Sequence, residues 1–134
     1  VKKMSALAKE FHVHIVYGMA EKEEDILYNS QFFLDDTGVL LGTYRKVHLF
    51  DSEKNYFTPG DQFKVFNTKI GRIGLFICYD AFFPEAARSL AIQGVDLLVN
   101  STNWEKPYDY DIAKQMKHDY YTMLTERRPD VYIA

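Results

Sequence analysis

Several features that would assign this 134-residue chain to a function class are absent or scarce. Cys78 is the only cysteine, which excludes an internal disulfide and favours a reducing, cytoplasmic location. No apolar run is long enough to span a membrane, and residues 1–11 are charged and amphipathic, unlike a signal peptide. A net charge of −3 gives no reason to expect a nucleic-acid partner. A Gly-rich phosphate loop and a GxSxG motif are also missing.

The composition is that of one globular domain. Hydrophobic residues make up 47% and charged residues 26%, and ten Phe and ten Tyr favour a β-rich core. A folded chain of this size buries roughly two thirds of its surface. The chain starts with Val1 in a helical pattern and stops at DVYIA, which is typical of the beginning of a strand. We therefore expect a fragment of a longer protein.

The apolar pattern predicts hairpins first, followed by alternating strands and helices. Helices are expected at residues 1–11, 82–94 and 110–127. Pro84 in the first turn and Gly94 at the end bound the second helix, whose apolar positions Ala86, Leu90 and Ile92 lie toward one face. Strands are expected at residues 13–19, 26–34, 39–50, 63–68, 72–79, 95–102 and 131–134. This order predicts an α/β fold: a mixed sheet with helices on at least one face.

Cys78 lies where the apolar run 73–78 gives way to the second helix. A strand that turns directly into a helix puts its last side chain at the carboxyl edge of the sheet, facing a crevice. Amides of the first helical turn favour negative charge there, which suits a thiolate and an oxyanion. These positions make Cys78 a candidate nucleophile. The alternative is a buried structural cysteine, which is common.

Lys46 and Glu53 are the next candidates. Lys46 is near the end of the otherwise apolar strand 39–50, where a lysine is costly unless paired. A cation there would stabilise a thiolate or an oxyanion, whereas an edge-strand lysine that blocks aggregation is the alternative. Glu53 is in the loop that follows, and taken alone it is a solvated loop carboxylate.

Three segments closely resemble the carbon–nitrogen hydrolase (nitrilase) superfamily: GTYRKVHLF at 42–50, PGD at 59–61 and the run 71–104. The resemblance covers nearly the whole chain. It implies an α-β-β-α sandwich of the nitrilase type, incomplete at both ends here, in a protein that forms homodimers or higher homo-oligomers. It also implies catalysis by Cys, Lys and Glu without a metal or an organic cofactor.

Carried over by residue, the resemblance makes Cys78 the nucleophile and Lys46 the residue that stabilises the tetrahedral intermediate. Glu53 matches a second, substrate-positioning Glu, and the Tyr79 backbone N–H would share the oxyanion site. The general-base Glu of the family lies upstream of this chain. We therefore interpret residues 1–134 as a partial domain that lacks the N-terminal strand with that Glu and the C-terminal portion.

Other acidic and imidazole groups fit the missing base or a metal poorly. Glu85 is in FPE, which resembles the sequence around the base but lies on the wrong side of the cysteine; its spacing from Arg88 suits an ion pair. Residues 21–25 are expected to form a polar turn, which makes Glu21, Glu23 and Glu24 poor substitutes. His12 and His14 alternate on a strand, but no third metal ligand is evidently placed beside them.

The residues after the cysteine bear on the substrate. Members of the superfamily that cleave nitriles usually have Trp-Glu there, whereas this chain has Tyr79-Asp80, which is similar to the amidase and carbamoylase branches. A linear amide or an N-carbamyl amine is therefore the expected substrate. Asn103 and Trp104 are candidate pocket residues, and a loop Asn with a packing Trp is the alternative.

Two other functions stay open. The chain could be a non-catalytic interaction module that keeps the dimer-forming helices 82–94 and 110–127. It could also belong to a branch of the superfamily that transfers the acyl group to an amine instead of water.

Overall fold

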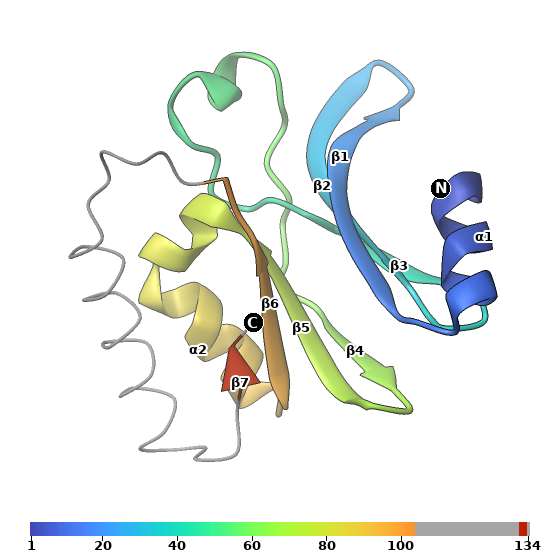
Figure 1. Cartoon of the computed structure of the whole chain (residues 1–134). Coiled ribbons are helices and arrows are strands. Elements are labelled where there is room, and N and C mark those ends of the chain that lie inside the picture. Colours follow the sequence, from blue (N-terminus) through green and yellow to red (C-terminus); the bar gives the residue numbers. More distant parts are fainter. Residues whose placement is uncertain (104–131, 134) are drawn as a thin grey trace. The chain divides into compact units, whose positions relative to one another are not determined.

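The computed structural model describes residues 1–103 and 132–133, and the chain divides into two compact units between Gln62 and Phe63 (Figure 1). The first unit contains α1 (Lys2–Phe11), β1 (Ile15–Glu23), β2 (Ile26–Leu34), β3 (Leu40–Arg45) and the 3-10 helix η1 (Asp51–Asn55). The second contains β4 (Val65–Thr68), β5 (Gly71–Ile77), the 3-10 helix η2 (Cys78–Phe82), α2 (Pro84–Ile92), β6 (Leu97–Ser101) and β7 (Tyr132–Ile133). The predicted helix 110–127 lies outside the described residues.

The first unit is built on a three-stranded antiparallel sheet in the order β1-β2-β3. Glu24 and Asp25 alone form the turn between β1 and β2, and Glu24 takes a left-handed φ of 53°. The prediction of a polar turn over 21–25 was therefore too wide. Glu21 belongs to β1, where its register partner is Tyr28, because its carboxylate finds partners across the sheet.

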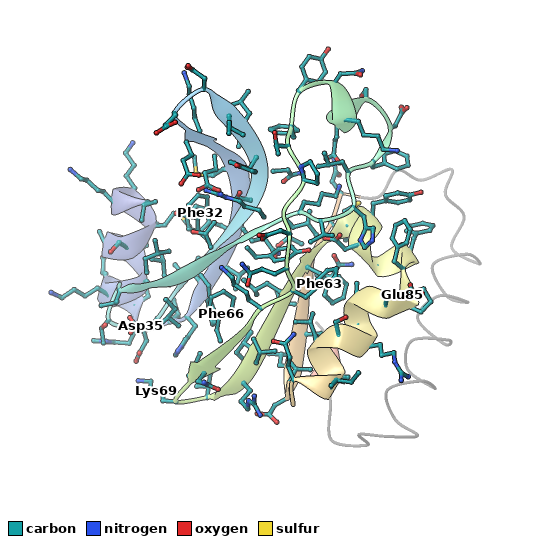
Figure 2. All side chains as sticks on the ribbon, turned by 180° about the vertical axis from the view of Figure 1, so that it is seen from behind. Phe32, Asp35, Phe63, Phe66, Lys69 and Glu85 are labelled. Atoms are coloured by element: carbon teal, nitrogen blue, oxygen red, sulfur yellow. The ribbon has the colours of Figure 1, made fainter. Side chains whose placement is uncertain are left out.

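β2 and β3 form one of the predicted hairpins, and the turn between them is held by one carboxylate. Asp35 Oδ1 accepts hydrogen bonds from the amides of Thr37 and Val39, each at 2.9 Å, and from the Thr37 hydroxyl at 2.7 Å. Gly38 has a φ of 84° and lies against the Ser5 carbonyl, where a Cβ would clash. Figure 2 shows Asp35 at this turn.

The predicted N-terminal helix is confirmed as α1, which lies alongside the three-stranded sheet (Figure 1). It ends at His12, whose backbone is left-handed with a φ of 52°. Of its apolar residues only Ala8 is fully buried, whereas Leu7 and Phe11 are exposed. The contact of α1 with its own unit is thus narrower than its apolar spacing indicates.

The second unit has a mixed sheet, as predicted, and its strand order is β4-β5-β6-β7. β4 and β5 are antiparallel, whereas β5, β6 and β7 are parallel. α2 connects β5 to β6 and packs on one face of this sheet (Figure 1). Gly74 permits the close approach of α2 and β6 to β5, because a Cβ at this position would lie 2.9 Å from Leu98 Cδ2 and 3.2 Å from Leu90 Cδ2. Among the described residues of the unit, the fully buried apolar ones are Leu75, Ala86, Ala87, Leu90, Val95 and Leu98.

The limits of α2 follow the sequence signals. Pro84 is its first residue, and Gly94 follows its end with a φ of 79°. Ile92 contradicts the predicted apolar face, because it is 72% exposed. Two residues after the buried Leu90, it points to the opposite side of the helix.

Glu85 lies on α2 (Figure 2), and it forms no ion pair with Arg88 within the described residues. In the described part of the chain, no helix has the length and hydropathy needed to cross a membrane.

Candidate active site

Lys46 is a buried cation at the end of β3. Only 2% of its side chain is exposed, and its Nζ donates a hydrogen bond to Glu53 Oε2 at 2.7 Å. β3 ends at Arg45, so Lys46 follows the strand rather than lying in it. A buried ammonium is costly unless it is paired, and this pairing meets that requirement. The geometry therefore does not fit an edge-strand lysine whose role is to prevent aggregation.

Glu53 lies on η1 and uses both carboxylate oxygens. Oε1 accepts a hydrogen bond from Asn29 Nδ2 at 2.8 Å, and Oε2 accepts one from the Phe50 amide at 2.7 Å in addition to Lys46. Burial alone would raise the pKa of Glu53, but the hydrogen bonds from Lys46, the Phe50 amide and Asn29 outweigh it and lower the pKa. A carboxylate held in this way is an ionised acceptor and not a solvated loop residue.

The backbone around Lys46 is fixed from both sides. The Lys46 N–H donates to the Asn29 carbonyl at 2.8 Å, and the Lys46 carbonyl accepts from the Gly60 N–H at 2.8 Å. Gly60 has no space for a side chain, because a Cβ there would lie 2.2 Å from the Arg45 carbonyl oxygen. The segment Pro59–Gly60 that follows η1 thus bonds back to the backbone of Lys46.

The residue before Lys46 is held by a second ion pair. Arg45 Nε and Nη2 donate to the two oxygens of Glu21 at 2.9 and 2.7 Å, and its guanidinium lies 3.8 Å above the Tyr28 ring. The Ser30 hydroxyl also donates to Glu21, at 2.6 Å. The hydrogen bond from Arg45 is the main cause that lowers the pKa of Glu21. These contacts tie the end of β3 to β1 and β2.

Cys78 lies in the second unit, at the sharp turn between β5 and η2. Its φ is 44°, a left-handed conformation that non-glycine residues adopt at a cost. Its N–H donates to Asn100 Oδ1 at 2.7 Å, and the preceding Ile77 N–H donates to Asp80 Oδ2 at 2.9 Å. Asp80 is fully buried and Cys78 is half-buried. Two side chains therefore hold the strained turn that presents the thiol.

The expected contact of Cys78 with the first turn of an α-helix is wrong in detail. η2 separates Cys78 from Pro84, where α2 begins, because Asp80 bonds back to Ile77 and tightens the chain into a 3-10 turn. The amides next to the thiol therefore belong to η2. Tyr79, half-buried on η2, packs its ring against Phe82 and Phe83 at centroid distances of 5.2 Å each.

The structure describes only one of the two predicted pocket residues. Asn103 is exposed and follows the end of β6, and Trp104 lies outside the described residues. The residue of β6 that contacts the cysteine is Asn100, which was not predicted from the sequence. Parallel strands end at the same edge of a sheet, so an Asn near the end of the second apolar run was the available signal.

The structure brings Lys46 and Glu53 together in the first unit and places Cys78 and Tyr79 on one turn of the second. Asn29, which bonds to Glu53, was also not predicted as a site residue. The available indication was a polar amide side chain inside the apolar strand predicted at 26–34. His12 and His14 were expected to alternate on a strand, but neither is in a strand.

These two histidines have structural surroundings. His12 ends α1, and the His14 ring lies 6.0 Å from the Phe33 ring. Within residues 1–103 and 132–133, no three His, Cys, Asp or Glu side chains gather as metal ligands do.

Comparison with protein families and curated proteins gives consistent matches. A family model described as carbon-nitrogen hydrolase matches residues 1–123. A probable nitrilase of Schizosaccharomyces pombe is 49% identical over 121 residues, which cover 87% of this chain and 44% of that protein. An N-carbamoylputrescine amidase of Solanum lycopersicum is 46% identical over 107 residues, which cover 76% of this chain and 36% of the relative. The chain thus spans less than half the length of these relatives.

Solved structures share the fold. Nit3 of Saccharomyces cerevisiae, described as a member of branch 10 of the nitrilase superfamily, matches 98% of this chain and 48% of its own, with a TM-score of 0.88 and 27% identity. A variant of the amidase from Nesterenkonia sp. AN1, which carries acrylamide added at its active-site cysteine, matches 75% of this chain and 41% of its own, with a TM-score of 0.70 and 27% identity. The α/β fold of the nitrilase type is therefore confirmed.

Proposed function

Since this chain belongs to the carbon–nitrogen hydrolase family, we propose that it carries part of an active site that hydrolyses a non-peptide C–N bond. The proposed substrate is a linear amide or an N-carbamyl amine, and the reaction passes through a thioester on Cys78. The observation that carries this proposal is the strained, half-buried turn at Cys78, held by Asn100 and Asp80. Strain of this kind presents a nucleophile at the end of a strand, as in other hydrolase folds.

Lys46 supplies positive charge for the oxyanion that forms on the substrate. The lysine ammonium must be held in a fixed position to do this, because the four-carbon stem is flexible. Glu53 Oε2, which accepts a hydrogen bond from Nζ at 2.7 Å, holds it. The Tyr79 backbone N–H is the second donor in this proposal, which makes an oxyanion site of one cation and one amide.

The general base is a Glu carried by sequence outside this chain. It takes the proton from Cys78 Sγ, and the thiolate attacks the carbonyl carbon of the substrate. The tetrahedral intermediate collapses when the C–N bond breaks, and the leaving amine or ammonia takes the proton from the base. The same Glu then deprotonates a water, whose oxygen attacks the thioester. The C–S bond breaks, the acid departs, and Sγ regains its proton.

The substrate class is argued from the residues beside the nucleophile and from the relatives. Tyr79 and Asp80 follow the cysteine, and relatives include proteins named as an amidase and as an N-carbamoylputrescine amidase. Asn103 and Trp104 are proposed to contact the substrate beyond the scissile bond. We also propose that the intact protein is cytoplasmic and forms a homodimer or a higher homo-oligomer, and light scattering of a form that carries the flanking coding sequence would test the oligomeric state.

Intact mass spectrometry tests the proposal. The samples are this chain and an extended form that carries its flanking coding sequence, each treated with iodoacetamide and with a small panel of amides and carbamyl amines. We expect Cys78 to alkylate quickly near neutral pH in the extended form and to gain the acyl mass of a substrate. The Cys78→Ala variant should gain neither mass.

A lysine pair separates the oxyanion role from general charge effects. Lys46→Met should lower kcat/KM by about 100-fold or more, as loss of an oxyanion donor does, whereas Lys54→Met, at an exposed lysine of η1, should change it less than about twofold. A folded extended form with an inert Cys78 would overturn the proposal and favour an interaction module. Trapping by hydroxylamine in preference to water would instead indicate acyl transfer.

A further inference from the structure

Asn29 contacts both members of the Lys46–Glu53 pair. Its side-chain amide donates to Glu53 Oε1 at 2.8 Å, and its backbone carbonyl accepts the Lys46 N–H at 2.8 Å. With the Lys46–Glu53 hydrogen bond at 2.7 Å, these contacts form a closed ring of three hydrogen bonds. One residue of β2 therefore fixes both ends of the pair: the backbone of the lysine and the carboxylate that holds its ammonium.

We propose that Asn29 is a positioning residue that sets the orientation of the Glu53 carboxylate and thereby the place of the Lys46 ammonium at the reacting carbonyl. This inference rests on the function proposed above. The terminal torsion of a glutamate is broad, so a single contact with Lys46 leaves its plane free to turn. The Phe50 amide bonds to the same oxygen as Lys46, and among the described residues Asn29 alone bonds to the other oxygen.

The chemistry at position 29 has to be that of a donor. Glu53 is acceptor-only when ionised, and an asparagine offers two N–H donors in a group nearly isosteric with a carboxylate. An aspartate there would face Glu53 acceptor to acceptor, and two carboxylates this close cannot both ionise. The groups that face Glu53 in the described residues are Lys46, the Phe50 amide and Asn29; the charged neighbours on η1, Asp51 and Lys54, are exposed.

Two substitutions in the extended protein test the inference through kinetics. Asn29→Ala should lower kcat by about tenfold or more with KM within about threefold, because a misplaced group costs rate more than ground-state binding. Asn29→Asp should lose as much at neutral pH, and its activity relative to wild type should recover as the pH falls. A proton on the introduced carboxyl restores a donor to Glu53, whereas the alanine variant has nothing to protonate.

Asn67→Asp is the matched control, because Asn67 is exposed on β4 and undergoes the same charge change. Its activity relative to wild type should be constant with pH. If Asn29→Ala keeps kcat within twofold, or if the aspartate and alanine variants lose activity in parallel at every pH, the positioning role is wrong. Thermal unfolding of each variant, followed by circular dichroism, identifies a simple folding defect.

A carbon-13 NMR titration of the Glu53 carboxyl separates this inference from the proposed function, because it needs no turnover. We expect Asn29→Asp to move the Glu53 midpoint to higher pH and Asn67→Asp to leave it unchanged. An unmoved midpoint in Asn29→Asp would overturn the inference even in an active enzyme. A moved midpoint in a protein without amide turnover would support the contact and overturn the proposed hydrolase.

Discussion

Cys78 and Asn100 illustrate how a single backbone position is stabilised by a distant residue. A left-handed φ at a non-glycine residue costs about 1–2 kcal/mol. Asn100 lies beside Phe76 in the parallel register of β5 and β6, so its side chain reaches the first amide beyond β5. Leaving a partly buried N–H without its acceptor costs about 1–3 kcal/mol. The hydrogen bond from the neighbouring strand is therefore of the same size as the strain it offsets.

This comparison predicts the effect of changing Asn100. Asn100→Ala in the extended protein should lower the free energy of unfolding by about 1–3 kcal/mol, because the Cys78 amide loses its acceptor. Asn100→Asp keeps an acceptor oxygen and should lose less than half as much. Urea unfolding measures both, with Asn67→Ala as an exposed control expected to change stability by less than about 0.5 kcal/mol. Equal losses for the alanine and aspartate variants would show that the acceptor does not matter.

Among the elements, those set by local signals were predictable. The turn at Asp35–Gly38, the start of α2 at Pro84 and its end before Gly94 depend on residues adjacent in sequence. The strand predicted over 39–50 was wrong after Arg45, because its apolar pattern continues while the chain leaves the sheet. Lys46 turns toward Glu53 at that point, and no local pattern encodes a partner on a later turn.

The extension of β1 through residues 21–23 has a similar cause. A charged run predicts a turn, but Glu21 is paired with Arg45 from β3 and bonded by Ser30 from β2. Only the three-strand register brings these residues together, so the sequence could not indicate that the acidic run continues the strand. The ion pair is partly buried, with 29% and 19% of the Arg45 and Glu21 side chains exposed.

The Glu21 contacts predict a pH-dependent stability. The hydrogen bond from Arg45 lowers the pKa of Glu21 in the folded state below its ordinary 4.5. The stabilisation is therefore present above that ordinary value and is lost as the pH falls through the folded-state pKa. Glu21→Gln should lower the free energy of unfolding by about 1 kcal/mol near neutral pH, and its difference from wild type should close in strong acid. Urea unfolding at several pH values measures this.

Glu10→Gln is the control for Glu21, because Glu10 is exposed on α1. Its free energy of unfolding should be close to that of wild type across the same pH range. A gap between Glu21→Gln and wild type that stays constant into acid would mean that the ion pair does not supply the stability.

For the molecule as a whole, the candidate site is divided along the chain. Lys46 and Glu53 precede residue 62, whereas Cys78 and Tyr79 follow it. The motif around each candidate made these residues recognisable from sequence. Asn29 and Asn100 were not, because each meets its partner through strand register and not through spacing along the chain. In both units an amide side chain holds the group to which chemistry is assigned.

The proposed position of the general base leads to the last prediction. This chain spans 44% of the Schizosaccharomyces pombe relative, and we propose that the general base lies outside these residues. The purified 134-residue chain should therefore hydrolyse amides about 100-fold to 10,000-fold more slowly than the extended form, since a general base contributes that much. Ammonia release, with Cys78→Ala in the extended form as background, measures the ratio of the two hydrolysis rates.

In the described residues β1 pairs with β2 alone, and such an open edge favours aggregation of the short chain, which sedimentation would detect. Turnover by the short chain at the rate of the extended form would mean that its base is already present, and Glu85 and Glu53 would be the first carboxylates to replace.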